Sequence, residues 1–152
     1  MKKYIGLLIL SMLSMYAYAG TTITWNQAGC ESVGGVWVKA NSATDTDKGC
    51  DSAHCNAKEF CRSPKKMNWW SAFAWCESIG AKLVDLESAC PNAITNNFFC
   101  ANLNGMSDKV FTNTPYNYAG SGQIYCVYSN GSMTHGANGQ TKDSFCALCE
   151  QK

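Results

Sequence analysis

The clearest pattern of apolar and polar positions lies near the middle of the chain. Trp69, Ala72, Phe73, Cys76 and Ile79 recur at intervals of three and four residues. In a helix these positions share one face, and an apolar face of this kind has to be covered by a core. The pattern therefore predicts an amphipathic helix that packs against the rest of the protein.

The residues on either side of this run predict where the helix begins and ends. Asn68 precedes it, and an asparagine side chain at that position accepts a hydrogen bond from a backbone amide that has no partner within the helix. Gly80 follows it, and glycine readily adopts the left-handed conformation that closes a helix. Residues 83–86 are then predicted to form a short strand.

Shorter patterns predict further elements. Residues 59–62 form the first predicted strand, and residues 110–112 form a later one. A second helix is expected within residues 88–103, where Phe98 and Phe99 are its predicted buried side chains.

Turn residues and polar runs complete the predicted architecture. Asn130-Gly131 stands between strand-like runs at 125–129 and 132–134, and this dipeptide favours a two-residue hairpin turn. Long polar loops are expected at 113–123 and 135–143. Helices followed by several short strands and separated by long polar loops predict an α+β fold class.

The N-terminus, residues 1–19, has the composition of a secretory signal peptide. Two lysines precede an apolar run over residues 5–15, and an Ala-Tyr-Ala sequence ends at Ala19, so cleavage is expected before Gly20. The apolar run is too short to span a bilayer, which takes about 20 residues. All ten cysteines follow this segment, and an even number of cysteines in an exported chain predicts disulfides.

The mature chain divides into two predicted parts. Residues 20–58 form a cysteine-rich N-terminal extension with too few apolar residues to fold without cross-links, and residues 59–152 form the larger domain. Removing the signal takes away Lys2 and Lys3, so the formal charge falls from +1 to −1. Without a basic run, the chain offers no sequence support for binding nucleic acid or for membrane insertion of the mature chain.

The predicted helix resembles the corresponding helix of the C-type lectin-like domain. In that family the helix carries Trp, then Ala three residues on and Cys four further, ends at Gly and leads to a strand that opens with Leu. The matching residues here are Trp69, Ala72, Cys76, Gly80 and Leu83. Similar Met-Asn-Trp-Trp-Ser segments occur in secreted bacterial proteins with this type of domain. Periodicity alone would also fit an amphipathic helix in another small domain.

The C-terminus strengthens the resemblance. Residues 145–150, Phe-Cys-Ala-Leu-Cys-Glu, are similar to the last strand of the family, so the resemblance covers residues 59–152 and implies a C-type lectin-like fold with two helices and short antiparallel strands. It also implies a disulfide between Cys76 and Cys149. Cys126 lies where the family has its second conserved cysteine, and because the usual partner is missing, the resemblance leaves Cys146 as the candidate for a displaced inner bridge.

The remaining cysteines are assigned from their positions alone. Cys90 and Cys100 flank the predicted second helix and are predicted to pair. The other four allow three arrangements, all of which remain open: Cys30, Cys50, Cys55 and Cys61.

Calcium binding is not expected. Sugar-binding members of the family hold the ion with carboxylate and amide side chains around a proline, because Ca²⁺ takes roughly six to eight oxygen ligands. The corresponding loops here, residues 114–118 and 134–140, contain no carboxylate. We expect no other metal and no cofactor.

The polar aromatic loops are the predicted binding surface. Tyrosine supplies contact area at low entropic cost, and asparagine and histidine add hydrogen bonds. The candidate ligand-binding residues are Asn113, Tyr116, Asn117, Tyr118, His135 and Asn138. Tyr125 and Tyr128 are further candidates, but on a strand such side chains more often serve packing, and loop asparagines are also common turn formers.

Catalysis is not indicated. Cys146 and Cys149 have the two-residue spacing of thiol oxidoreductases, but in those enzymes the motif opens a helix, whereas this pair lies on a predicted final strand. His135 has no serine and acid arranged beside it as a nucleophile system. A zinc site is not expected either, because the spacing of its four possible ligands matches no closed zinc module: Cys50, His54, Cys55 and Cys61.

The sequence thus predicts a secreted, periplasmic or cell-surface module that binds a protein or a glycan without catalysis and without calcium. The alternative is a structural or accessory subunit of a cell-surface assembly, whose contacts are with neighbouring subunits. A large exposed apolar patch would favour the assembly. A concave polar region rimmed by Tyr116 and Tyr118 would favour ligand binding.

Overall fold

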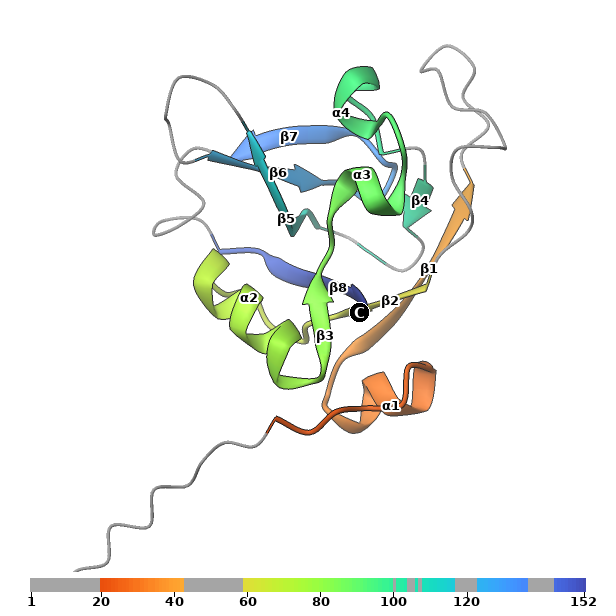
Figure 1. Cartoon of the computed structure of the whole chain (residues 1–152), viewed down its shortest axis with the longest axis vertical. Coiled ribbons are helices and arrows are strands. Elements are labelled where there is room, and N and C mark those ends of the chain that lie inside the picture. The colour runs from red at the N-terminus through yellow and green to blue at the C-terminus, as the bar shows by residue number, and fades with distance from the viewer. Residues whose placement is uncertain are drawn as a thin grey trace, which may run out of the picture.

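The computed structural model is an α+β domain with a curled mixed sheet and few helices (Figure 1). The structure describes these residues: 20–42, 59–99, 101–103, 106, 108–116, 123–136 and 144–152. The predicted signal peptide, residues 1–19, lies outside them. So do Cys50, His54, Cys55 and Cys100.

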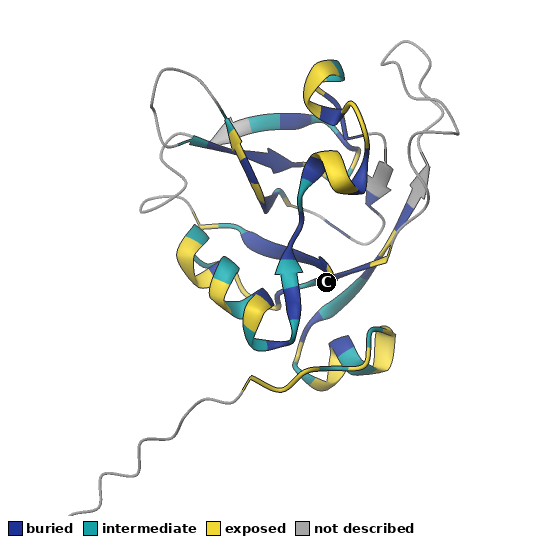
Figure 2. Ribbon diagram, in the orientation of Figure 1, coloured by how far each residue is buried: buried dark blue, intermediate teal, exposed yellow. Residues whose placement is uncertain are grey.

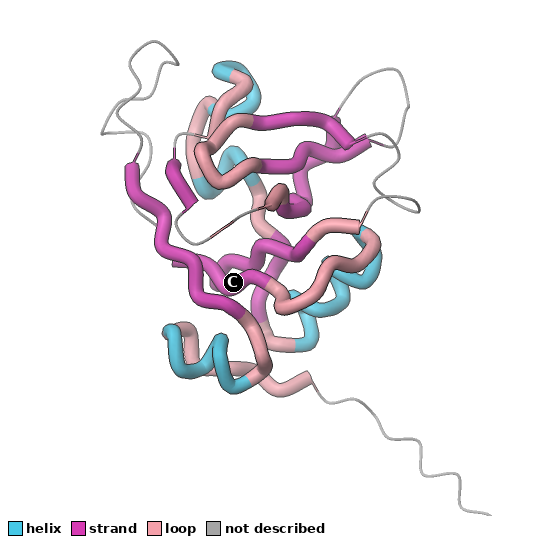
Figure 3. Tube along the Cα trace, turned by 180° about the vertical axis from the view of Figure 1, so that it is seen from behind, coloured by secondary structure: helices cyan, strands magenta, loops and turns pink. Residues whose placement is uncertain are grey.

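Eight strands pair in the order β4-β1-β2-β8-β5-β6-β7, with β3 added against β8. Seen from behind, they form the middle of the molecule, and the helical segments lie around them (Figure 3). The strands are β1 (Val36–Ser42), β2 (Glu59–Arg62), β3 (Ala81–Leu83), β4 (Ala101–Leu103), β5 (Val110–Tyr116), β6 (Gln123–Val127), β7 (Met133–Gly136) and β8 (Cys146–Gln151). The expectation of antiparallel strands needs one correction, because β5 and β8 run parallel.

The helix predicted from the apolar pattern is α2 (Trp69–Ser78), and both of its predicted ends are confirmed. The side chain of Asn68 accepts a hydrogen bond from the backbone N–H of Ser71 at 2.8 Å. Gly80 lies just beyond the C-terminus with φ 76°, in the left-handed region that glycine adopts without a steric penalty. The chain can therefore turn directly into β3.

The predicted second helix is wrong in its extent. Residues 88–103 hold the end of α3 (Leu86–Ala89), the separate single turn α4 (Ala93–Asn96) and the strand β4. Pro91 follows Cys90, the C-cap of α3, and proline both lacks the N–H that a helix needs and disfavours a helical conformation in the residue before it. The predicted burial of Phe98 and Phe99 is confirmed.

The strand predicted at 83–86 is also wrong in its extent, because β3 begins at Ala81 and shares only Leu83 with the prediction. β3 ends at Leu83, and Asp85 instead serves as the N-cap of α3, where its side chain accepts a hydrogen bond from the N–H of Ser88 at 2.9 Å. The two predicted loops begin later than expected, because β5 continues to Tyr116 and β7 to Gly136.

The hairpin predicted at Asn130-Gly131 joins β6 to β7, but its loop has three residues instead of two. Tyr128 N–H donates to the carbonyl of Ser132 at 2.9 Å, and Gly131 N–H donates to the carbonyl of Tyr128 at 3.0 Å. Gly131 has φ 85°, which matches the left-handed position of a three-residue hairpin loop.

Two buried clusters lie on opposite faces of the central strands, while the helices keep an exposed side (Figure 2). One cluster includes Val110 of β5 and is covered by α3 and α4. The other includes Phe111, the next residue of β5, and is covered by α2 through Ala72 and Cys76. Because successive residues of a strand point to opposite faces, β5 contributes to both clusters.

The described part of the N-terminal extension shares this sheet. Its helix α1 (Gln27–Ser32) is capped by Asn26, whose side chain accepts a hydrogen bond from Gly29 N–H at 2.8 Å. Its strand β1 lies between β4 and β2. The extension therefore joins the larger part through backbone pairing as well as through a disulfide.

Candidate functional site

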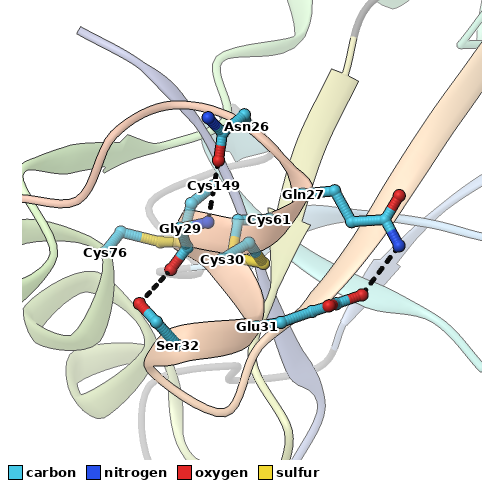
Figure 4. The surroundings of a disulfide bond; sticks show 9 residues. All are labelled: Asn26, Gln27, Gly29, Cys30, Glu31, Ser32, Cys61, Cys76 and Cys149. Atoms are coloured by element: carbon cyan, nitrogen blue, oxygen red, sulfur yellow. Dashed lines mark hydrogen bonds between the residues drawn. A yellow bond between two sulfur atoms is a disulfide. The ribbon is translucent and has the colours of Figure 1, made fainter.

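Two neighbouring disulfides link the helices α1 and α2 to the strands β2 and β8 (Figure 4). Cys76 of α2 bonds to Cys149 of β8, with 5.5 Å between the Cα atoms, which confirms the bridge implied by the resemblance. Cys30 of α1 bonds to Cys61 of β2, with a Cα separation of 5.7 Å. Cys61 and Cys149 are register partners, so the two bridges are neighbours and link α1, β2, β8 and α2 in a row.

The predicted bridge between Cys126 and Cys146 is wrong, since Cys146 is a free, buried cysteine. Strand order gives the physical reason. β5 lies between β6 and β8, which places the two cysteines two strand spacings, or about 9–10 Å, apart, whereas disulfides require Cα atoms within about 7 Å. They also face opposite sides, because Cys126 pairs with Phe111 and Cys146 with Val110.

The remaining cysteine predictions are only partly covered by the described residues. Cys90 is disulfide-bonded, and its predicted partner Cys100 lies outside the described residues. Cys61 is already bonded to Cys30, so it cannot serve as the zinc ligand considered above. The observed disulfides agree with an exported protein.

Three of the six predicted ligand-binding residues lie on described strands, and two of these, Tyr116 and His135, lie toward the same end of the β5–β6–β7 sheet. Asn113 is exposed, and Tyr116 is half-buried at the end of β5. His135 of β7 is the register partner of Tyr125 in β6. Three candidates lie outside the described residues: Asn117, Tyr118 and Asn138.

At this sheet end the tyrosines mainly serve packing. The rings of Tyr116 and Tyr125 meet edge to face with centroids 5.2 Å apart, and Tyr125 is only 8% exposed. Burial raises the pKa of the Tyr125 hydroxyl, and the nearby Tyr116 and Glu87 raise it further. The packing interpretation is therefore confirmed for Tyr125.

A more exposed aromatic surface lies elsewhere, at the start of α2. Trp70 is 57% exposed, and its ring stands edge to face on Trp69 with centroids 4.9 Å apart. Two contacts hold the Trp69 side chain in place. Its indole N–H donates to the carbonyl of Thr112 in β5 at 2.9 Å, and its ring stacks on Phe73. The exposed indole of Trp70 therefore packs on a Trp69 side chain that is itself held in place.

A second exposed aromatic side chain is Tyr128, after β6, which is 39% exposed and so does not follow the packing interpretation. The ammonium group of Lys109 lies 4.6 Å from the ring centre of Phe145 and 5.6 Å from that of Tyr128, so it attracts both rings. Phe145 in turn contacts Phe111 of β5, with centroids 5.0 Å apart.

We call the set Trp69, Trp70, Phe145, Lys109 and Tyr128 the aromatic strip. Its two halves border the same stretch of β5, since Trp69 bonds to Thr112 and Phe145 packs on Phe111. The sequence did contain a signal for it. Residues of a helix are about 100° apart, so if Trp69 lies on the buried face, its neighbour Trp70 has to point away from the core.

A surface ion pair borders the strip. Lys66 and Asp108 are 2.6 Å apart and join the segment before α2 to the segment before β5. The hydrogen bond and the charge of Asp108 raise the pKa of the Lys66 ammonium. Both side chains are exposed, so we assign this pair to the polar edge of the strip and not to the stability of the fold.

No group of three or more His, Cys, Asp and Glu side chains within the described residues is placed to hold a metal ion. Among the same residues, no helix has the length and apolar character needed to cross a membrane.

Comparison of the chain with protein-family models, with curated proteins and with solved structures finds no match. The C-type lectin-like resemblance therefore stays a prediction based on the residues quoted above. At the level of fold class, the domain is α+β.

Proposed function

We propose that this protein is an exported, disulfide-stabilised binding module of the C-type lectin-like kind, which recognises a glycan or a protein at the cell exterior. It acts without catalysis and without calcium. The observation that carries the proposal is the aromatic strip, where Trp70 and Tyr128 expose large apolar rings to solvent.

The strip has the physical properties of a recognition surface. Tryptophan and tyrosine are enriched among the residues that contribute most to binding free energy. The Trp69 hydrogen bond and the Lys109 contacts hold the rings in place before a ligand arrives, and a preorganised surface loses less conformational entropy on binding. Aromatic faces beside a polar pair also suit a sugar, which presents both C–H faces and hydroxyl groups.

The fold part of the proposal rests on the bridge between α2 and the final strand. The resemblance implies that bridge, and the Cys76–Cys149 disulfide agrees with it. Gly80 also follows the helix as the resemblance implies, whereas Leu83 ends β3 and does not open it.

The alternative function, a subunit of a surface assembly, would use the same strip. Exposed aromatic side chains favour it, because burying each ring against a neighbouring subunit would remove apolar area from water. In that case the mature protein self-associates or binds its neighbours, and it has no free-standing ligand.

The first test is a glycan array with the oxidised, processed protein, once with calcium and once with a chelator. We expect binding that the chelator leaves unchanged, because the loops at 114–118 and 134–140, which correspond to the calcium loops of the family, contain no carboxylate. Binding that needs calcium would contradict the proposal. Absence of binding in both conditions, together with self-association in sedimentation, would support the assembly.

A further inference from the structure

The first described residues run along the C-terminal end of α2 (Figure 1). The backbone N–H of Ile23 donates to the carbonyl of Ile79 at 3.1 Å, directly after the helix. Ile23 and Trp25 pack, half-buried, against the cluster that contains Ile79. This segment is therefore held in place where the helix ends.

One carbonyl of the last turn of α2 has no hydrogen-bond donor among the described residues. The carbonyl oxygens of Cys76 and Glu77 accept hydrogen bonds from backbone N–H groups that follow the helix, at 3.3 and 3.0 Å. The carbonyl of Trp75 accepts from the Ser78 hydroxyl at 2.7 Å. Among the described residues, no donor reaches the carbonyl oxygen of Ser78.

Gly20 lies against this carbonyl. A Cβ atom placed on Gly20 would overlap the Ser78 carbonyl oxygen and stand 2.9 Å from the carbonyl carbon, closer than real Cβ atoms approach backbone. Only glycine fits there without moving the chain. The same residue follows the predicted cleavage site, so the atom next to this contact is the future N-terminal nitrogen.

We propose that the α-ammonium group created by cleavage binds the Ser78 carbonyl and thereby caps α2. In this step water hydrolyses the Ala19–Gly20 amide, which leaves a carboxylate on the leader and an amine on Gly20 that takes up a proton. An ammonium offers three donors, and the C-terminal end of a helix carries partial negative charge. Removal of the signal therefore completes the fold as well as releasing the protein.

Other charges at this end of the molecule are already paired. Glu77 in the last turn of α2 binds Lys152 at 2.6 Å, and Lys82 of β3 binds Glu150 at 3.4 Å. Since these carboxylates have partners, we assign the α-ammonium to the carbonyl. The pKa of this α-ammonium group should be raised above the usual range of about 7.7–8.0, because only the charged form supplies three donors.

The test uses the protein exported with its own signal peptide. Its N-terminal sequence should begin at Gly20, and NMR titration of the Gly20 α-amino group should give a raised pKa. The stabilisation is then complete below about pH 7.7 and is lost as the pH rises through the raised value. A mature chain that begins at another residue, or an ordinary α-amino pKa, would overturn the proposal.

A variant pair provides the control. Gly20→Ala should lower the melting temperature and return the α-amino pKa to its ordinary range, because the methyl group collides with Ser78. Thr21→Ala, at an exposed neighbouring position, should leave both unchanged. An unchanged pKa in Gly20→Ala would contradict the docking, and the wild-type titration remains decisive if that variant is not processed.

Discussion

Tyr125 is a side chain whose burial has a measurable consequence. Its raised pKa means that the folded protein keeps this hydroxyl protonated at a pH where the unfolded chain, with a tyrosine pKa of about 10, has begun to lose the proton. Tyr125 therefore favours the folded state fully below about pH 10, and this contribution disappears as the pH rises through the raised pKa.

An ultraviolet titration of the phenolate signal checks this expectation. The wild-type protein should show a tyrosine that ionises above the usual range, and Tyr125→Phe should remove that late phase. Tyr128→Phe is the matched control, because Tyr128 is exposed and should leave the late phase in place. A late phase that survives in Tyr125→Phe would show that another tyrosine produces it.

Glu150 is a second residue with a specific structural role. It is 7% exposed and accepts hydrogen bonds from the N–H of Asp85 at 3.0 Å and from the hydroxyl of Ser88 at 3.2 Å. Glu150→Gln should lower the free energy of unfolding by about 1–3 kcal/mol, because an amide replaces a carboxylate that fixes the start of α3.

Urea unfolding measures this loss. Glu31→Gln is the control, since Glu31 is exposed on α1 and its change should stay within about 0.5 kcal/mol. Equal effects of the two substitutions would contradict the role assigned to Glu150.

At the scale of elements, the disulfides follow the order of the strands. Non-reducing peptide mapping should find the Cys76–Cys149 and Cys30–Cys61 links and no link between Cys126 and Cys146. Replacing both Cys76 and Cys149 by Ala should cost about 2–5 kcal/mol of stability. A Cys126–Cys146 peptide would contradict the placement of β5 between their strands.

The elements that sequence predicted correctly have local signals. The limits of α2 follow from Asn68 and Gly80, which act within a few residues of the helix ends. The extent of the second helix is predicted wrongly, because Pro91 divides the segment into α3 and α4. The pairing of Cys126 failed for a different reason, since strand order depends on contacts between distant segments.

At the scale of the whole molecule, the candidate site is the aromatic strip and not the loops that the sequence predicts. Residue types pointed to tyrosines, but exposure depends on the finished fold: Tyr125 is buried, whereas Trp70 is not. The strip also combines residues from α2, the segment before β5 and the segments beside β6 and β8. No single stretch of sequence shows that they meet.

Binding by matched variants tests the central claim most directly. Wild-type protein, Trp70→Ala, Ile94→Ala and Asn113→Ala would be compared on the glycan array and in sedimentation. Ile94 is a suitable control because it is an exposed apolar residue on α4, and Asn113 represents the predicted loop end. All three substitutions replace exposed side chains, so each should fold with nearly unchanged stability.

We predict that Trp70→Ala loses at least about tenfold in affinity, whether the interaction is with a glycan or with another copy of the chain, because a loss of about 1.4 kcal/mol corresponds to that factor. The two controls should bind like the wild type. Undiminished binding by Trp70→Ala, or binding lost in Asn113→Ala alone, would contradict the claim that the aromatic strip is the recognition surface.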